Sequence, residues 1–395
     1  MTAPIDTSTA RQIQQQLESD HGYLLELLKR LVEAESPSTV AASQSNVQQL
    51  LRDEREVLDY RSHQIPGRET GGYLVGTPKS RKRGAPVQVL LGHCDTVWPL
   101  GTLQTMPIEI RDGRMTGPGV FDMKAGLVQM IGALRAIERL ELVPEVTPIL
   151  LINSDEEIGG AESKTAVIRL SRVADRVLVV EPALGPTGKL KTARKGVGQF
   201  TVEIAGKAAH SGLDPGKGIS AILELSHVIQ KLFALNDLDN GISVNVGIIE
   251  GGTRANVVAA QSRAQIDIRV VSVHQADEIE AAVRAIGAEL EGTQIEFKGG
   301  FEVLPLERTP RNRVLWDIAR ESAALIDLDL EETLAGGASD GNLASQYAAT
   351  LDGLGPVGDG AHAAHEFIQI DSLVERGALL TMMLLAPCLS NQAGA

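Results

Sequence analysis

The chain has 395 residues, of which 43% are hydrophobic and 22% are charged, and its formal net charge is −14 at pH 7. This is the composition of a globular protein, and the length favours two domains. An acidic chain without a lysine- and arginine-rich block does not suit nucleic-acid binding, and no run of about 18 apolar residues offers a membrane span. The N-terminal segment lacks the pattern of a secretory signal, and the only cysteines are Cys94 and Cys388, so we expect a cytoplasmic protein.

Hydrophobic patterning up to residue 191 predicts helices that alternate with buried strands. Apolar residues recur at steps of three and four in the helical segments, which are 13–36, 47–60 and 124–140. Continuous apolar runs predict buried strands that begin at residues 86, 147 and 176, and the first of these ends at His93. Buried strands that alternate with helices are typical of a parallel sheet covered by helices.

The pattern changes between residues 192 and 304, where the order is strand, helix, strand, strand, helix, strand. This order is that of the ferredoxin-like, or split βαβ, unit. A helical pattern over 313–326 and a strand pattern over 348–356 then return to the earlier style. We therefore predict an α/β catalytic domain with a mixed, mostly parallel sheet, made of residues 1–191 and 305–395. An inserted ferredoxin-like α+β domain occupies residues 192–304.

Acidic and histidine side chains follow the predicted strands where each strand ends. His93 and Asp95 follow the first strand, Glu156 and Glu157 follow the second, and Glu181 follows the third. In open parallel sheets, ligands bind outside the carboxyl ends of the strands. We therefore expect these clusters to converge on one crevice.

Two further polar clusters lie outside these strands. Asp122 stands just before the helix at 124–140, which it could also cap, and His362 and His365 lie in "GDGAHAAHE". Histidines together with several carboxylates suit a divalent ion such as zinc. Because there are more candidates than one ion can use, we predict two ions about 3.5–4 Å apart with a shared carboxylate. The glycines of "GPGVF" lack the third glycine and the acidic partner of a dinucleotide site, so we predict none.

The motifs "GHCDTV", "GPGVFDMKAG", "SDEEIGG", "EPA", "GKAAHSG" and "GAHAAHE" occur in this order along nearly the whole chain. Each motif is weak to moderate by itself, but the ordered set resembles the M20 zinc metallopeptidases, in particular their glutamate carboxypeptidase branch. The resemblance implies two zinc ions per subunit, and cobalt or manganese suits the same ligands. The ligands that it implies are His93 and Glu181 for one ion, Glu157 and His362 for the other, and Asp122 as the bridge.

The resemblance also assigns roles to residues that do not bind metal. Asp95 would orient the ring of His93, and Glu156 would be the general base of the reaction. Relatives place the ligand histidine four residues before a glutamate, which selects His362 over His365. Asp155 completes the acidic trio, and we interpret it as an acid that stabilises the turn or supports a ligand.

The inserted domain contributes further residues by the same resemblance. His210, from "GKAAHSG", would enter the active site of the partner subunit in a homodimer and hold the carbonyl oxygen of the substrate. Asn256 and Arg269 resemble lid residues that meet the substrate. The inserted domain is therefore expected both to form the dimer and to cover the site.

Binding of the substrate carboxylate is expected from a glycine-rich loop. Gly337 lies in "GGASDGN", residues 336–342, which resembles the loop that lines the substrate carboxylate with backbone N–H groups. A glutamate side chain on the substrate would need a basic partner as well. Lys189 and Arg308 are the candidates for that partner.

The function implied by these residues is metal-dependent hydrolysis of the amide bond next to a C-terminal amino acid. The substrate would be a small peptide or an N-acyl amino acid, with glutamate as a candidate for the released residue. An N-acyl amino acid deacylase or a dipeptidase would use the same metal ligands and stays an alternative. A non-catalytic relative that binds an amino acid is a further alternative, which the presence of all five ligands and Glu156 disfavours.

Overall fold

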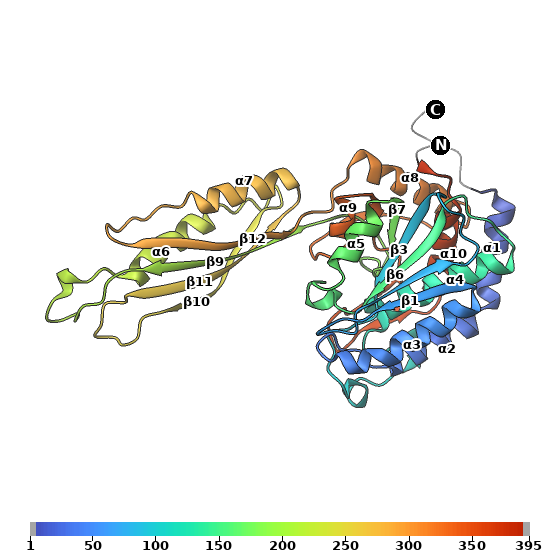
Figure 1. Cartoon of the computed structure of the whole chain (residues 1–395), viewed down its shortest axis with the longest axis horizontal. Helices are drawn as coiled ribbons and strands as arrows, with labels where there is room; N and C mark the ends of the chain where they lie inside the picture. The colour runs from blue at the N-terminus through green and yellow to red at the C-terminus, as the bar shows by residue number, and fades with distance from the viewer. Residues whose placement is uncertain (1–4, 390–395) are drawn as a thin grey trace. The chain divides into compact units, whose positions relative to one another are not determined.

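The computed structural model describes residues 5–389, and the chain divides into two compact units (Figure 1). The first unit comprises Met1–Thr192, Arg308–Ala335 and Ser339–Ala395, and the second comprises Ala193–Glu307 and Gly336–Ala338. Within the described part of the chain, no helix has the length and apolar character needed to cross a membrane.

A mixed six-stranded sheet forms the centre of the first unit, with the strand order β1-β2-β6-β3-β7-β14. Its strands are β1 (Tyr60–Ile65), β2 (Tyr73–Pro78), β3 (Val87–His93), β6 (Thr147–Asn153), β7 (Ala174–Val179) and β14 (Ala349–Leu351). The pairs that join β6, β3, β7 and β14 are parallel, which confirms the predicted sheet. The antiparallel strands β1 and β2 lie at one edge and were not predicted, because the polar sequence of β1 lacks an apolar run.

Helices cover both faces of this sheet (Figure 1). They are α1 (Thr7–Ser19), α2 (His21–Glu33), α3 (Ala41–Val57), α4 (Ala125–Arg139), α5 (Lys164–Ser171), α8 (Pro310–Ala324), α9 (Asp340–Ser345) and α10 (Ser372–Leu385). Leu90 of β3 belongs to the core with α1, α4 and α10, whereas Val89 and Leu91 belong to the core with α5 and α9. Successive side chains of a strand point to opposite faces, so a strand between two helical layers must be apolar throughout.

The predicted helix over 13–36 is in fact two helices, α1 and α2, which are separated at Asp20. Asp20 is buried, and its carboxylate lies 3.7 Å from Arg135 and 3.8 Å from Arg139. Aspartate and glycine are poor helix formers, and Gly22 lies two residues after Asp20. The apolar pattern continues through the boundary between α1 and α2 and does not reveal it. Contacts of Asp20 with α4 stabilise this boundary.

Two smaller sheets complete the first unit. One has the order β15 (Gly358–Asp359), β16 (Phe367–Gln369), β5 (Arg114–Thr116) and β4 (Ile110–Arg111), and the other pairs β13 (Glu332–Ala335) with β8 (Leu190–Arg194). Short helical turns of this unit lie at Thr102–Gln104, Val120–Lys124 and Glu156–Ile158, and another lies at Pro215–Lys217 in the second unit. Because Phe367 pairs with Thr116, the four-stranded sheet joins two segments that are far apart in the sequence.

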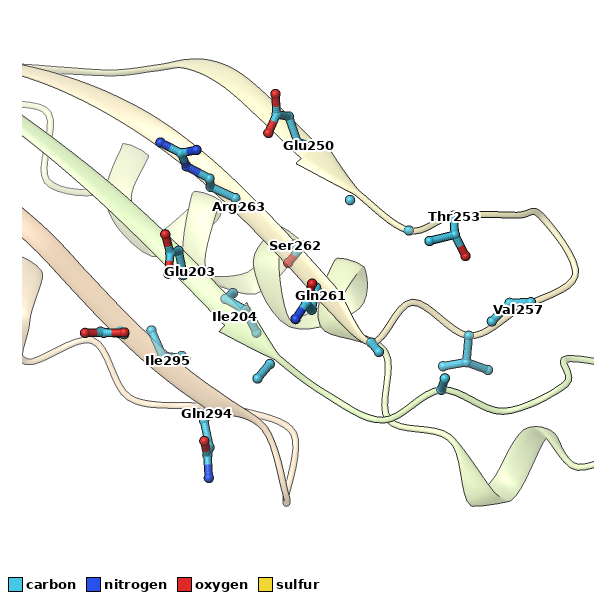
Figure 2. A pocket seen from close by; sticks show the side chains of 17 residues that line it. Glu203, Ile204, Glu250, Thr253, Val257, Gln261, Ser262, Arg263, Gln294 and Ile295 are labelled. Atoms are coloured by element: carbon cyan, nitrogen blue, oxygen red, sulfur yellow. The ribbon is translucent and has the colours of Figure 1, made fainter.

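The second unit has the predicted order of elements. They are β9 (Gly196–Ala205), α6 (Ala221–Phe233), β10 (Ser243–Gly251), β11 (Gln261–Val270), α7 (Val273–Arg284) and β12 (Gln294–Val303). The four strands form an antiparallel sheet with the order β10-β11-β9-β12, and both helices pack on the same apolar face. The other face is polar, and Glu203, Arg263 and Glu250 project from adjacent strands into a hollow there (Figure 2). None of the residues that line this hollow is a predicted site residue.

Glu224 of α6 fastens the segment that follows α7. Its buried carboxylate accepts hydrogen bonds from the backbone N–H groups of Glu289 at 2.9 Å and Leu290 at 2.7 Å, and from the hydroxyl of Thr293 at 3.1 Å. Burial raises the pKa of Glu224, but these hydrogen bonds lower it below its ordinary value overall. The carboxylate form therefore stabilises the second unit.

Replacing Glu224 with Gln should destabilise the second unit, because the amide group turns an N–H donor toward backbone donors. We expect a loss of about 1–3 kcal/mol at pH 7, seen as a lower unfolding temperature. A group whose pKa is lowered by folding stabilises the protein above its unfolded pKa, and this contribution disappears as the pH falls through the folded pKa. Thermal unfolding of wild type and E224Q at pH 7 and below about pH 4 measures it. An equal difference at both pH values would contradict this account of Glu224.

Candidate metal centre

Three neighbouring strands end at the same edge of the large sheet. His93, the last residue of β3, pairs in register with Asn153, the last residue of β6. Leu91 of β3 pairs with Val179, where β7 ends two residues before Glu181. The side chains that follow these strands therefore start from one place.

The imidazole of His93 is buried between carboxylates. Its Nε2 lies 3.3 Å from Asp122 Oδ1 and 3.4 Å from Glu181 Oε1. Its Nδ1 lies 3.1 Å from the carbonyl oxygen of Asp95 and 3.4 Å from Asp95 Oδ1. Burial lowers the pKa of His93, but the carboxylates of Asp122, Asp95 and Glu181 raise it well above its ordinary value. A histidine whose Nδ1 faces acceptors in this way is oriented to offer Nε2 to a metal ion.

The two oxygens of Asp122 face two different histidines. Oδ1 faces His93, and Oδ2 lies 3.4 Å from Nε2 of His362. The same Nε2 lies 3.0 Å from Glu157 Oε2. The hydrogen bonds to Asp122 and Glu157 raise the pKa of His362 to about 10. Asp122 is thus shared between two groups of side chains, as a carboxylate that bridges two metal ions must be.

The backbone is unusual at both ends of this arrangement. Asp122 lies in the wide helical turn Val120–Lys124, and the peptide bond between Asp122 and Met123 is cis. His362 has a φ of 61°, in the left-handed region that residues other than glycine rarely adopt. Such residues persist where the surrounding structure holds them, often at functional sites. The idea that Asp122 also caps α4 is wrong, because no side-chain hydrogen bond caps this helix.

The cluster contains polar atoms that are buried without a hydrogen-bond partner among residues 5–389. They are His93 Nε2, Asp95 Oδ1, Asp122 Oδ1 and Glu157 Oε1. Such atoms are rare in proteins and costly unless something else satisfies them. Tetrahedral zinc with bonds of about 2.0–2.1 Å places its ligand atoms about 3.3–3.4 Å apart. The distances of His93 Nε2 from Asp122 and Glu181 and of His362 Nε2 from Asp122, 3.3–3.4 Å, agree with this value, and the 3.0 Å between His362 and Glu157 is shorter. Imidazole with carboxylate donors suits zinc, cobalt and manganese alike.

The adjacent residues Glu156 and Glu157 have different partners. One carboxylate oxygen of Glu156 lies within 4.8 Å of the ligand atoms of His93 and Glu181, whereas Glu157 pairs with His362. Burial raises the pKa of Glu156 well above its ordinary value, and the nearby acids raise it further. A bound cation would offset part of this shift. A carboxyl group that holds a proton readily in such a place suits general acid–base chemistry.

Two acids of the first unit, Asp95 and Asp155, stabilise the segments that carry the candidate ligands. Asp95 Oδ2 accepts hydrogen bonds from the hydroxyl of Ser38 at 2.7 Å and from the backbone N–H of Glu157 at 3.2 Å. Asp155 Oδ2 accepts hydrogen bonds from the backbone N–H groups of Glu162 at 2.8 Å and Ser163 at 3.1 Å. These hydrogen bonds agree with the interpretation that Asp155 stabilises the turn that carries Glu156 and Glu157.

The site also contains residues that the sequence did not single out. Nζ of the buried Lys191 lies 3.9 Å from Glu181 Oε2. Asp340 accepts a hydrogen bond from Asn153 Nδ2 at 2.6 Å, and burial raises the pKa of Asp340 to about 7. Asp340 lies within the glycine-rich segment 336–342, which was a usable signal. Lys191 lies in a strand that is buried throughout, where no pattern marks a functional lysine.

His210 and Asn256 lie together in the second unit. His210 is exposed, and its Nδ1 accepts hydrogen bonds from the backbone N–H groups of Gly212 and Leu213, both at 3.1 Å. The ring proton is therefore on Nε2, which can donate outward. The backbone N–H of Ser211 donates to the carbonyl of Asn256 at 3.1 Å, so the two loops are joined.

Arg269 lies at the other end of the same sheet. Eight residues of β11, from Gln261 to Ile268, separate it from the loop of Asn256, a distance of about 26 Å along the strand. Its guanidinium forms two hydrogen bonds with Asp267, of 2.8 and 2.9 Å. Arg269 and Asn256 of one subunit therefore cannot contact the same small substrate.

The candidate residues for carboxylate binding already have partners. Lys189 Nζ lies 2.5 Å from Glu331, and Arg308 Nε lies 3.2 Å from Glu332. Gly337 is exposed, and its carbonyl accepts a hydrogen bond from Arg194 at 3.1 Å. The charge of both basic groups is thus balanced by acids of the protein.

Comparison with known proteins identifies a matching domain and several homologues. Residues 192–292 match the M20 peptidase dimerisation domain. Carboxypeptidase G2 from Pseudomonas sp. (strain RS-16) is 25% identical over 323 residues, which cover 78% of this chain and 75% of that protein. Acetylornithine deacetylase from Myxococcus xanthus is 26% identical over 330 residues, which cover 80% of this chain and 84% of that protein.

A solved structure shares the fold over almost the full length. The aminopeptidase PepT from Bacillus cereus ATCC 10987 superposes with a TM-score of 0.75 and 21% identity, over 94% of this chain and 98% of that chain. The fold, the dimerisation domain, the homologues and the cluster of metal-binding side chains agree with one another. The chain therefore contains an M20 peptidase dimerisation domain and is homologous to carboxypeptidase G2 and other M20 metallopeptidases, which are metal-dependent hydrolases.

Proposed function

We propose that this chain holds two zinc ions and hydrolyses the amide bond next to the free carboxylate of a C-terminal amino acid. The observation that carries the proposal is the position of Asp122 between His93 and His362. His93 and Glu181 would hold one ion, Glu157 and His362 the other, and Asp122 both. Such ions, when bound, polarise a carbonyl group and make water a stronger nucleophile.

The remaining steps belong to side chains of the protein. Glu156 takes a proton from the attacking water on its carboxylate and later gives it to the leaving nitrogen. Asp95 keeps the His93 ring in place and, through the backbone N–H of Glu157, fixes the turn that carries the base. His210 from a second copy of the chain in the homodimer would donate from Nε2 to the carbonyl oxygen as negative charge develops there. The loop of Gly337 lines the substrate carboxylate.

The second candidate function is deacylation of an N-acyl amino acid. It is supported by the similarity to acetylornithine deacetylase, which covers 84% of that protein. Both reactions break an amide bond next to an amino acid and use the same groups. We do not assign glutamate preference to Lys189 or Arg308, because each is paired with an acid.

We also propose that the second unit forms a homodimer along the edge strand β10. The strand is at the end of its sheet, and Ile248 and Ile249 on it are 51% and 62% exposed. Ile222 and Leu223 of α6, which packs against this strand, are 47% and 48% exposed. An edge strand with exposed apolar side chains is suited to pairing with another chain, and the match to the M20 dimerisation domain includes β10.

Antiparallel pairing of β10 with its copy has a consequence for the substrate contacts. Ser243, at the start of β10, pairs with Arg269, whereas Gly251 at its end leads toward the loop of Asn256. A two-fold axis through the strand exchanges these ends. The His210 and Asn256 end of one subunit therefore approaches the Arg269 end of the other. This arrangement accounts for residues that are too far apart within one subunit to share a substrate.

Replacing Glu156 with Gln should remove turnover and leave metal binding intact, because the amide cannot take a proton from water. We expect two ions per chain by elemental analysis and a rate about 10²–10⁴-fold lower. Release of free amino acid from acyl-glutamate, acyl-alanine and a free-amine dipeptide measures the reaction. Glu278→Gln, the same change at an exposed site on α7, is the control and should behave as wild type.

The two outcomes that oppose this proposal differ. An E156Q protein as active as wild type would contradict the assigned role of Glu156 as the general base. Wild type that cleaves only free-amine dipeptides would replace the carboxypeptidase assignment with a dipeptidase. Cleavage of the acyl amino acids supports the proposal, and the preferred acyl group then separates carboxypeptidase from deacylase.

Replacing Ile249 with Lys should weaken the homodimer, since burying a charge at a strand edge is unfavourable. Sedimentation velocity should give a dimer for wild type and a larger monomer fraction for I249K. Val143→Lys is a matched control, because Val143 is 87% exposed and lies in the first unit. A monomeric wild type, or an I249K protein that is as dimeric as V143K, would argue against this interface.

A further inference from the structure

Glu366 is a buried carboxylate that the proposed reaction does not use. Its side chain has no exposed surface, and four N–H groups donate to it. Oε1 accepts from the backbone of Phe121 at 2.9 Å and of Asp122 at 3.0 Å. Oε2 accepts from the backbone of Gly119 at 2.9 Å and from the indole Nε1 of Trp98 at 2.8 Å.

The four donors come from segments that carry predicted metal ligands. Asp122 is the shared carboxylate itself, and Trp98 follows His93 by five residues. Glu366 follows His362 by four residues, and both lie in the connection between β15 and β16. Since β16 also pairs with β5, which leads into the Asp122 turn, the carboxylate closes a ring of contacts around Asp122.

Two glycines allow the close approach that these contacts require. Gly119 has a φ of 72°, and a Cβ there would come within 2.4 Å of Thr96. Gly360 has a φ of 82°, and a Cβ there would come within 2.9 Å of the backbone of Glu366. Both positions therefore depend on the absence of a side chain. The segments are shaped to bring backbone N–H groups onto one carboxylate.

The two predicted metal sites depend on Glu366 to different degrees. His93 has its own support from Asp95, and Glu181 has Lys191 nearby. The side chain of His362, in contrast, is 51% exposed and lies on a left-handed backbone. Its loop ends at Glu366, whose carboxylate is anchored to the Asp122 turn.

We propose that Glu366 is a positioning residue that holds Asp122 and the His362 loop in register, and so sets the affinity for the ion at Glu157 and His362. This inference rests on the proposed two-metal function. Each oxygen of Glu366 accepts two N–H groups, so a glutamine there would face at least one pair of donors with its own N–H₂ group. Glu366→Gln is therefore a change of hydrogen bonding at nearly constant volume.

The test measures the two stepwise zinc affinities of the full-length protein. Competition with a chromophoric chelator gives each affinity. In E366Q we expect the affinity for the ion at Glu157 and His362 to fall about 10- to 100-fold, and that for the ion at His93 and Glu181 to fall less. Absorbance of the cobalt-loaded protein reports the same change at the ligands without turnover. A general loss of stability would not separate the two ions in this way.

Two further variants keep the test decisive. Glu224→Gln disturbs a comparable buried carboxylate in the second unit, and it should lower stability without changing either zinc affinity. Trp98→Phe removes one donor and leaves Glu366 in place, so it should weaken the same ion by a smaller factor. If E366Q does not fold, W98F decides, and an unchanged affinity in W98F then overturns the proposal.

The outcomes distinguish this inference from the function on which it rests. Wild type that binds no divalent ion overturns the proposed function and this inference with it. Wild type that binds two ions, with both affinities unchanged in E366Q and W98F, overturns this inference alone. Equal weakening of both ions also overturns it, because Glu366 would then act on the whole unit.

Discussion

The carboxylate of Asp122, placed between the imidazoles of His93 and His362, is the contact on which the rest of the catalytic unit depends. A carboxylate has two oxygens, so it can face both histidines only if the fold places one histidine next to each oxygen. The end of β3 supplies one histidine, and the connection between β15 and β16 supplies the other. The large sheet, the small sheet and the turn before α4 all serve to bring these three side chains together.

Electrostatics explains why so many acids can be tolerated in this place. Buried carboxylates repel one another, and burial with neighbouring acids raises the pKa of Glu156 well above its ordinary value. Divalent cations reverse that balance and favour the charged form of the ligands. In the proposed mechanism the neighbours Glu156 and Glu157 would have different tasks, since Glu157 faces His362 while Glu156 lies near His93 and Glu181. The proposed proton carrier and the proposed metal ligand are therefore adjacent in the sequence.

Much of the fold follows from local patterns, because strands that are buried on both faces need continuous apolar runs, as β3 does. The convergence of side chains at strand ends follows from the geometry of parallel sheets in the same way. Contacts between distant segments leave no such pattern. The four donors to Glu366 lie between Trp98 and Asp122, and nothing in the sequence links them to it. Likewise, the break at Asp20 and the pairing of Lys189 with Glu331 depend on neighbours supplied by the tertiary fold.

The central claim is that Asp122 bridges two metal ions, and anomalous X-ray scattering at the zinc edge tests it most directly. Crystals grown with zinc should show two anomalous peaks, one on each side of the Asp122 carboxylate. The peak at Oδ1 should lie between His93 and Glu181, and the peak at Oδ2 between His362 and Glu157. A single peak, or peaks that do not contact Asp122, would contradict the account.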